Sequence, residues 1–395
     1  MKDKNISWEW VEEHIADDPK ALWLKFGKER EAEITQIECR RRFGKKLAAT
    51  LLRVPHWLFP SVLAGEQSTS DRLAVFHSSL VPECARMVDL TAGLGIDALH
   101  CAGVAASVVA VEMDRERAEA LAANVHEAAA DNIEVVEADC REWLEGYNGE
   151  RFDIAFIDPA RRDAAGGRVF ALSDCEPDIT AMLPLLREKC RRVLVKMSPM
   201  LDISSVLEAL PACVRIFSLG TPTECKELLA LLDFDHEPGT ADEIAIEAVT
   251  VGPDTTHTFR CTRAEELVAD AVYGVPRAGD IVCEPYPAVM KAGAVRLVSQ
   301  RYSLQKLAPN THVYFASAPS ADFPGEQRRV VEVLPWASKV LKRFRNKYPR
   351  LQVATRNFGM SAEALRKKLD VTDGGTGRLL AVTDLSGERH LIVLE

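Results

Sequence analysis

The chain has 395 residues, of which 47% are hydrophobic and 27% are charged, and its formal net charge is −10. This length allows two or three domains with sizeable cores, and the composition is typical of a globular protein. The acidic balance excludes a protein that coats nucleic acid with its whole surface, because phosphate neutralisation requires clustered Lys and Arg.

The first 18 residues, MKDKNISWEWVEEHIADD, are charged and lack the apolar core of a secretory signal. The sequence has no run of 18 apolar residues, so we expect a cytoplasmic protein without a membrane partner. The ten cysteines form no CxxC pair, and no His cluster has zinc-ligand spacing. We therefore expect reduced cysteines and no metal site.

Residues 1–75 have apolar side chains at spacings closer to 3.6 than to 2, among them Trp8, Val11 and Ile15. This pattern predicts a small helical N-terminal subdomain. The segment VPHWLFP at 54–60 contains two prolines and cannot continue a helix, so it leads into the next unit.

Residues 76–252 alternate short apolar runs with helical stretches, which indicates a parallel sheet with crossover helices. We predict strands at 86–90, 107–113, 133–138, 152–158 and 192–197. Asp114 and Asp202 are expected to cap the helices that follow them. Three further apolar runs, at 213–220, 227–234 and 243–252, follow, and we expect at least one to close the sheet as an antiparallel edge strand.

Residues 253–395 mix helical and strand patterns, which predicts a small α+β domain. Helices are expected in WASKVLKRFRNKY and SAEALRKKL, and a terminal hairpin in RLLAVTDL and RHLIVLE around Ser386 and Gly387. The predicted domains are therefore 1–75, 76–252 and 253–395.

The motif VDLTAGLGID at 88–97 places Asp89 at a strand end, with Gly93 and Gly95 at the mouth of the next helix. Glycine allows a ligand to approach the backbone closely, and the helix start offers free N–H groups. The run from Gly93 to Ala98 also fits the G-x-G-x-x-A turn of dinucleotide-binding enzymes. A nicotinamide enzyme is therefore the first alternative.

Three later strand ends favour S-adenosylmethionine (SAM) over a nicotinamide. Glu112 can accept both ribose hydroxyls of either cofactor, so it does not discriminate. Asp139 suits an adenine amino group, and Asp158-Pro159 ends the fourth strand, at the edge where open α/β sheets bind substrate. Together with the glycine turn, these residues predict a SAM site.

The chain resembles a bacterial family of class I SAM-dependent methyltransferases that carry a C-terminal THUMP-like domain. The segments behind this resemblance are EQSTS (66–70), VDLTAGLGID, IDPARRD with GGRVFALSD, VKMSP, TECKELL, EPYPAVMKAG (284–293), FPG (323–325) with EVLPW, and TRNFGMSAEALRKKL (355–369). It implies an α/β chain: a Rossmann-like class I methyltransferase domain, preceded by the helical subdomain and followed by an α+β THUMP-like domain. Because THUMP domains accompany RNA-modifying enzymes, it also implies an RNA substrate, tRNA or rRNA, with no readout of DNA sequence.

The resemblance also implies cofactor contacts. Asp89, Gly93 and Gly95 would contact the methionine end of SAM, Glu112 the ribose and Asp139 the adenine. Asp158 would line the same site. Gln67 and Ser68 would close over the cofactor, or alternatively form an exposed helix cap.

Asp158-Pro159 resembles the start of the D/N-P-P-aromatic motif of enzymes that methylate exocyclic amino groups. Ala160 and Arg161 replace the second proline and the aromatic residue, so the clamp on a flipped base is missing. Asp158 is the candidate that orients or deprotonates the acceptor, and Pro159 accompanies it. Lys196 ends the fifth strand at the same edge, either as a catalytic group or as a partner for an acid.

Arg161 and Arg162 come after Asp158-Pro159-Ala160 and are candidate phosphate ligands. The alternative is that they form ion pairs with Asp163 or Asp174.

A basic segment at 326–368 holds twelve Lys or Arg against three Glu. The helix predicted at 337–348 has an apolar stripe that leaves its basic residues to water, with no acid between Glu332 and Glu363 to pair with them. We expect these residues to bind RNA, and the alternative is a solvated face. They are Lys339, Lys342, Arg343, Arg345 and Lys347.

Three functions remain open. The first is an RNA methyltransferase, and the second is a methyltransferase acting on a small molecule or a protein. The third is a SAM-binding or RNA-binding protein without catalysis.

Overall fold

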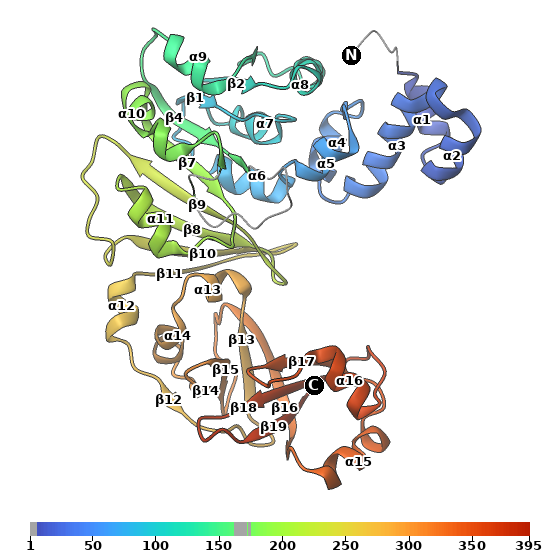
Figure 1. Ribbon diagram of the computed structural model, residues 1–395, viewed down its shortest axis with the longest axis vertical. Helices are drawn as coiled ribbons and strands as arrows, with labels where there is room; N and C mark the ends of the chain where they lie inside the picture. Colours follow the sequence, from blue (N-terminus) through green and yellow to red (C-terminus); the bar gives the residue numbers. More distant parts are fainter. Residues whose placement is uncertain (1–5, 162–171, 173–174) are drawn as a thin grey trace. The chain divides into compact units, whose positions relative to one another are not determined.

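The computed structural model describes residues 6–161, 172 and 175–395. The chain divides into two compact units. The first contains residues 1–216 and 227–239, and the second contains residues 217–226 and 240–395. Both units combine helices with sheets (Figure 1).

The N-terminal part of the first unit is helical, as its apolar spacing predicts. Ser7 caps the first helix, and Asp18 with Pro19 starts the second. No helix covers residues 54–60, where the two prolines occur. The helices are α1 (Trp8–Glu13), α2 (Pro19–Phe26), the 3-10 helix η1 (Gly27–Arg30), α3 (Glu31–Phe43), α4 (Ala48–Arg53), α5 (Val62–Gln67) and α6 (Asp71–Ser78).

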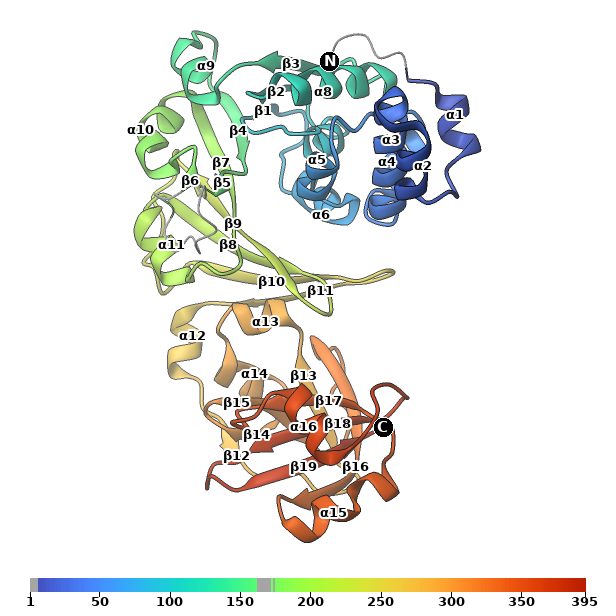
Figure 2. The same ribbon diagram turned by 45° about the vertical axis from the view of Figure 1, so that its right-hand side comes forward.

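Seven neighbouring strands of the first sheet run in the order β3-β2-β1-β4-β7-β9-β8 (Figure 2). They are β1 (Arg86–Asp89), β2 (Ser107–Glu112), β3 (Ile133–Glu137), β4 (Phe152–Ile157), β7 (Cys190–Met197), β8 (Cys213–Gly220) and β9 (Cys225–Asp233). The first five of these in the chain are parallel. The strand order reverses at β1, and open α/β sheets bind ligands at the carboxyl ends of the strands around such a point.

Strand β9 is antiparallel to β7, with Lys196 opposite Leu229. An antiparallel strand was expected, but its predicted place at the edge was wrong. β9 lies between β7 and β8, so both of its edges are paired. Most of its side chains are apolar and buried, which is typical of a strand inside a sheet and not of an exposed edge.

Helices connect the strands of the first unit. Asp114 accepts a hydrogen bond from the Arg117 N–H and Asp202 from the Ser204 N–H, so both predicted caps are confirmed. The helices are α7 (Ile96–Cys101), α8 (Arg115–Glu127), α9 (Cys140–Gly146), α10 (Ile179–Lys189) and α11 (Ile203–Ala209). A short antiparallel pair, β5 (Ala160–Arg161) and β6 (Cys175–Glu176), follows β4.

The second unit contains an eight-stranded sheet in the order β12-β14-β15-β13-β16-β19-β18-β17. The strands of this sheet are β12 (Val272–Tyr273), β13 (Ile281–Pro285), β14 (Gln305–Ala308), β15 (Thr311–Ala316), β16 (Gly325–Pro335), β17 (Gln352–Arg356), β18 (Arg378–Thr383) and β19 (Arg389–Leu394). Before them in the chain comes an antiparallel pair that is not part of this sheet, β10 (Ala245–Val251) and β11 (Thr256–Cys261). The helices of the second unit are α12 (Arg263–Val268), α13 (Pro287–Lys291), α14 (Val295–Arg301), α15 (Ser338–Lys347) and α16 (Ala362–Leu369).

The predicted terminal hairpin is formed by β18 and β19, which pair antiparallel. Successive side chains of a strand point to opposite faces of its sheet. Accordingly, Leu379 and Leu391 belong to one buried cluster with Phe344 of α15, while Leu380 and Ile392 belong to another. Both faces of the hairpin are therefore covered, which explains its continuous apolar sequence.

Among the described residues, no helix is long and apolar enough to cross a membrane.

Candidate functional site

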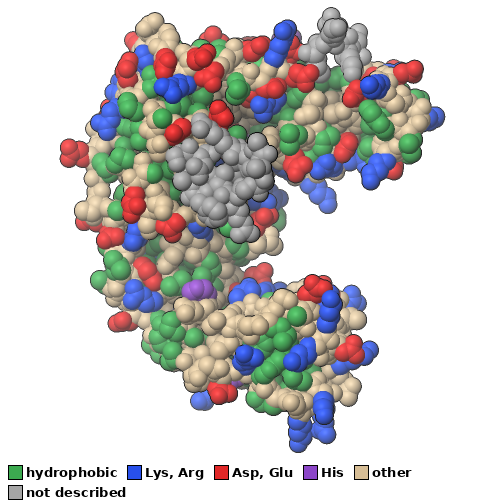
Figure 3. All heavy atoms as spheres, viewed as in Figure 1, with side chains coloured by type: hydrophobic (Ala, Val, Ile, Leu, Met, Phe, Trp, Pro, Cys, Tyr) green, Lys and Arg blue, Asp and Glu red, His purple; other side chains and the backbone are tan. Residues whose placement is uncertain are grey.

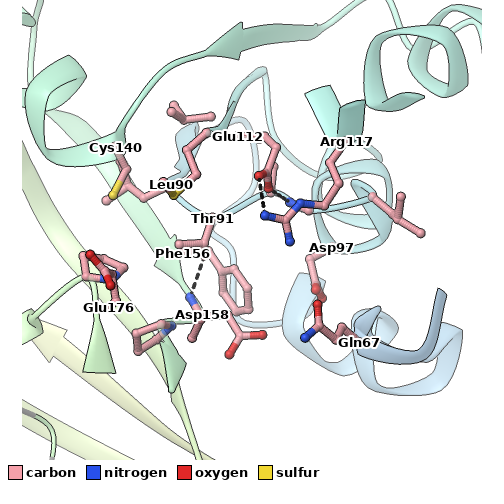
Figure 4. Close-up of a pocket in the computed structure, with 18 of the residues that line it drawn as sticks. Gln67, Leu90, Thr91, Asp97, Glu112, Arg117, Cys140, Phe156, Asp158 and Glu176 are labelled. Atoms are coloured by element: carbon pink, nitrogen blue, oxygen red, sulfur yellow. Dashed lines mark hydrogen bonds and ion pairs between the residues drawn. The ribbon is translucent and has the colours of Figure 1, made fainter. Parts of the chain in front are cut away.

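A pocket of about 690 Å³ lies at the carboxyl ends of β1, β2, β3 and β4 (Figure 4). Its volume is in the range of small-molecule sites. The predicted site residues that line it are Gln67, Ser68, Gly93, Glu112, Asp139, Asp158 and Pro159. Residues separated by up to 92 positions in the chain thus meet in one place, because parallel strands end at the same edge.

The turn after β1 is shaped by backbone hydrogen bonds. The Thr91 N–H donates to Asp89 Oδ1 (3.1 Å), and Asp89 itself is buried and is not among the residues lining the pocket. Desolvation by burial, reinforced by the Asp97 carboxylate, raises the pKa of Asp89 well above its usual range. Asp89 thus stabilises the backbone of the turn through this hydrogen bond.

The two glycines of this turn have different surroundings. Gly93 has a φ of +56°, and an added Cβ would meet no atom within 4 Å. Gly95 has a φ of +79°, and an added Cβ would lie 2.1 Å from Leu121 Cδ1. Gly93 therefore lines open space in the pocket, whereas Gly95 allows α7 to pack against α8.

Glu112 ends β2 and is only 5% exposed. Its Oε2 accepts the Gly93 N–H and its Oε1 accepts the Asp114 N–H, both at 2.8 Å. Arg117 Nη2 lies 3.2 Å from Oε1, and Figure 4 shows the two side chains together. Glu112 thus joins the glycine turn to the start of α8, with its carboxylate at the pocket wall.

Asp139 begins α9 and lines the pocket beside Cys140. Its Oδ1 accepts the N–H groups of Arg141 (2.9 Å) and Glu142 (3.0 Å), so the carboxylate is fixed as a helix cap. Burial, with the Asp139 carboxylate, raises the pKa of Cys140 to about 12. A thiol with such a pKa is not a nucleophile at neutral pH.

Asp158 follows β4, and its N–H donates to Thr91 Oγ1 at 2.7 Å. Its side chain is 38% exposed, with Oδ2 2.5 Å from Lys196 Nζ. Desolvation raises the pKa of Asp158, against the lowering effect of the Lys196 ammonium. For Lys196, burial opposes the charge, but the neighbouring carboxylates, Asp158 first, raise its pKa. Lys196 is therefore an ion-pair partner of Asp158.

Gln67 and Ser68 lie at the end of α5, at the rim of the pocket. Ser68 Oγ donates to the Gly65 carbonyl at 2.9 Å, which ties it to the helix. Ser68 is thus the C-cap of α5 and also lines the pocket, and closure of Gln67 and Ser68 over a cofactor stays a prediction.

Sequence reasoning did not single out four polar residues beside Asp158 and Lys196: Thr69, His77, Asp97 and Glu227. His77 is fully buried, with Nδ1 2.7 Å from Asp97 Oδ1 and Nε2 2.5 Å from Glu227 Oε1. Thr69 Oγ1 donates to Asp97 Oδ2 at 2.5 Å. The available signal was that Thr69, Asp97 and Glu227 lie in segments that carry the family resemblance, EQSTS, VDLTAGLGID and TECKELL.

Two predicted substrate residues cannot be placed in the site. Arg162 lies outside the described residues, as do Asp163 and Asp174. Only the backbone of Arg161 is described, in β5, where Arg161 pairs with Cys175.

The predicted basic helix is α15 in the second unit, with Lys339, Lys342 and Arg343 exposed. Figure 3 shows Lys and Arg side chains on the visible face of the second unit. The interpretation that its charges lack acidic partners was wrong for two residues. Arg345 pairs with Asp370, and Lys347 Nζ lies 2.7 Å from Glu332 Oε2. These acids come from other parts of the chain, which spacing along the helix cannot reveal.

Two family models match the second unit. Residues 282–324 match a ferredoxin-like domain, and residues 325–395 match a THUMP domain-like model. A search of curated proteins finds no match to this chain.

Solved structures are also similar. The crystal structure of a putative methyltransferase from Porphyromonas gingivalis W83 is 30% identical, with a TM-score of 0.90, over 100% of this chain and 99% of that chain. A putative methyltransferase from Escherichia coli is 19% identical, with a TM-score of 0.30, over 42% of this chain and 83% of that chain. A putative methyltransferase from Streptococcus mutans in complex with SAH is 12% identical, with a TM-score of 0.32, over 41% of this chain and 94% of that chain.

The last two similarities are too weak to carry an argument. The first covers both chains almost completely, and it agrees with the reversal of strand order at β1 and with the THUMP domain-like match. The chain therefore belongs to the family of class I SAM methyltransferases that carry a C-terminal THUMP-like domain.

Proposed function

We propose that this protein transfers the methyl group of SAM to RNA. The observation that carries the proposal is the meeting of Gly93, Glu112, Asp139 and Asp158 in one pocket at the carboxyl ends of four successive parallel strands. This is the edge at which open α/β sheets bind nucleotide-like ligands.

The residues present fit SAM. The side of Gly93 that lacks a Cβ faces open space, so a ligand can approach the backbone there. The Glu112 carboxylate lies at the pocket wall for the ribose hydroxyls, and the Asp139 carboxylate for the adenine amino group. When bound, SAM supplies an electrophilic methyl group on a good leaving group.

The chain's own contribution is to align the acceptor and to exclude water. Asp158 is exposed to the pocket and carries a negative charge that Lys196 stabilises. A carboxylate in this position accepts a hydrogen bond from an N–H or O–H of the acceptor and can take up its proton. Asp158 therefore orients an acceptor that carries a hydrogen on the methylated atom.

RNA as the acceptor is supported by the THUMP domain-like match at residues 325–395. It is also supported by Lys339, Lys342 and Arg343, which α15 exposes and which can contact phosphates. The pairing of Arg345 and Lys347 with acids favours the second candidate, a methyltransferase that acts on a small molecule or a protein.

The test uses tritiated SAM with total RNA from cells that lack this protein. We expect label in RNA that ribonuclease releases and protease does not, and none with the Asp158→Asn variant. If the label resists ribonuclease but is lost on treatment with protease, the acceptor is a protein and not RNA. In parallel, calorimetry should show that SAM binds and NADH does not. Preferential binding of NADH would refute the cofactor assignment.

A further inference from the structure

Six polar side chains form one connected network beneath the proposed acceptor position. They come from the segment before α6, from α6 and α7, from the residue after β4, and from β7 and β9, and all belong to the first unit. The members are Thr69, His77, Asp97, Asp158, Lys196 and Glu227. Five of them lie in the short segments that carry the family resemblance, and the sixth, His77, joins two of the others.

The geometry fixes the protonation of His77. Each ring nitrogen lies within 2.7 Å of a carboxylate oxygen, Nδ1 of Asp97 and Nε2 of Glu227. An ionised carboxylate only accepts hydrogen bonds, so with both acids ionised both nitrogens donate and the ring is an imidazolium. Burial opposes this charge, but Glu227 and Asp97 raise the pKa of His77 to about 9.

Lys196 connects Glu227, a partner of His77, to Asp158 in the pocket. Its ammonium lies 2.5 Å from Asp158 Oδ2, 3.4 Å from Thr69 Oγ1 and 4.0 Å from Glu227 Oε2. The two cations, His77 and Lys196, thus alternate with three carboxylates, so each cation is held between acids.

The network is open to the pocket chiefly at Asp158. The Asp158 side chain is 38% exposed, compared with 11% for Asp97 and 5% for Glu227. A buried lysine beside a single carboxylate would pay a desolvation penalty that favours loss of the charge. The carboxylates of Asp158, Glu227 and Asp97 together keep the Lys196 ammonium charged, and its contacts with Asp158 and Glu227 determine its position.

We propose that His77, Asp97, Glu227 and Lys196 are positioning residues that hold the Asp158 carboxylate at the acceptor side of the pocket. Lys196 fixes one oxygen of Asp158, which also fixes the direction of the other. Asp89 of β1, which is buried at the glycine turn, also interacts electrostatically with Asp158. This inference rests on the proposed function only in assigning the acceptor to Asp158.

The first measurement is made on the unmodified protein. Nitrogen-15 NMR of labelled histidine should show a ring with both nitrogens protonated from pH 6 to pH 8, and this signal should be missing in His77→Gln. A His77 ring that is neutral at pH 7 would overturn the proposal, whatever the protein catalyses.

The second measurement follows the Asp158 carboxyl carbon by carbon-13 NMR, with Asp158→Asn to assign the signal. In Glu227→Gln the pKa of Asp158 should fall, because the Glu227 carboxylate repels the ionised form. In His77→Gln it should rise, because the loss of the cation leaves Asp97 and Glu227 uncompensated. The matched control is Asp233→Asn. Asp233 lies on the same strand as Glu227, is also buried, and pairs with Arg192 at 2.9 Å.

Opposite shifts in the two variants, with none in the control, are not produced by a general loosening of the fold. If the Asp158 titration is the same in all three variants, the network does not act on Asp158. Where the parent methylates RNA, the acid limb of its kcat against pH should move in the same two directions. If the parent transfers no methyl group, the proposed function fails, while the NMR titrations still decide the role of the network.

Discussion

Replacing Glu112 by Gln removes one charge without changing the size of the side chain, and the structure predicts two separate losses. In the parent, one carboxylate oxygen accepts the Gly93 N–H and the other accepts the Asp114 N–H, at 2.8 Å each. An amide has only one oxygen, so its NH2 group must face one of these donors. A buried N–H without an acceptor costs about 1 to 3 kcal/mol.

The free energy of unfolding should fall by that amount, which lowers the melting temperature by about 2 to 12 °C for a unit of this size. Loss of the charged acceptor for the ribose hydroxyls should weaken SAM binding by about 1 to 3 kcal/mol, or roughly 5- to 150-fold in Kd. Arg117, 3.2 Å from Glu112, loses its ionic partner at the same time.

The two effects are separated by measuring SAM binding calorimetrically well below the lower melting temperature. The control is Glu119→Gln in α8, the helix that follows Glu112, because the ion pair of Glu119 with Arg115 lies at the surface and contributes little to stability. If Glu112→Gln melts as predicted but binds SAM as tightly as the parent, Glu112 supports the turn and does not contact the cofactor. If it neither melts earlier nor binds more weakly, the argument from its hydrogen bonds is wrong.

Four further outcomes are expected. Asp158→Ala should leave SAM affinity nearly unchanged and lower turnover about 100-fold or more, which unaltered methylation of the true substrate would contradict. Gly95→Ala should destabilise the protein by about 2 kcal/mol or more in chemical denaturation, because its φ of +79° and the contact with Leu121 both oppose a Cβ, whereas Gly93→Ala, with open space, should cost less. Reversing three exposed basic residues of α15 to Glu should weaken RNA binding and reduce its logarithmic salt slope by about 0.7 to 0.9 per lost contact, with SAM binding retained: Lys339, Lys342 and Arg343. The pKa of His77 is raised from its ordinary value of 6.5 to about 9 in the folded protein, so the contribution of this group to stability should be complete below pH 6.5 and lost as the pH rises through 9. Denaturation midpoints with the same pH dependence in the parent and in His77→Gln would contradict this.

Local features of this protein could be predicted from its sequence. The caps Asp114 and Asp202 act on N–H groups two or three residues away, so the pattern that predicts them is contained in a few positions. The strand ends that carry Gly93, Glu112, Asp139 and Asp158 were predictable for a related reason. Parallel strands with crossover helices bring successive carboxyl ends to one edge, so local order implies spatial proximity.

Features that depend on distant pairing could not be predicted. His77 and Glu227 are 150 residues apart, and an isolated His in a helix gives no sign of its partners. Likewise, no sequence period distinguishes which of three apolar runs inserts beside β7. The acids that pair with Arg345 and Lys347 lie on other elements, so spacing within α15 gave the wrong expectation for them.

The division of the chain between its two units affects the folding of the protein during synthesis and the fragments that cleavage can produce. Residues 217–226 belong to the second unit, although the residues before and after them belong to the first. The chain therefore passes from one unit to the other three times, and no single cleavage yields two intact pieces. During synthesis, β9 with Glu227 emerges from the ribosome after this first excursion. One of the two carboxylate partners of His77 is thus missing until the strand has been inserted, and a fragment that ends at residue 216 would retain the cofactor-binding motifs with Asp97 as the one remaining partner named for that buried ring.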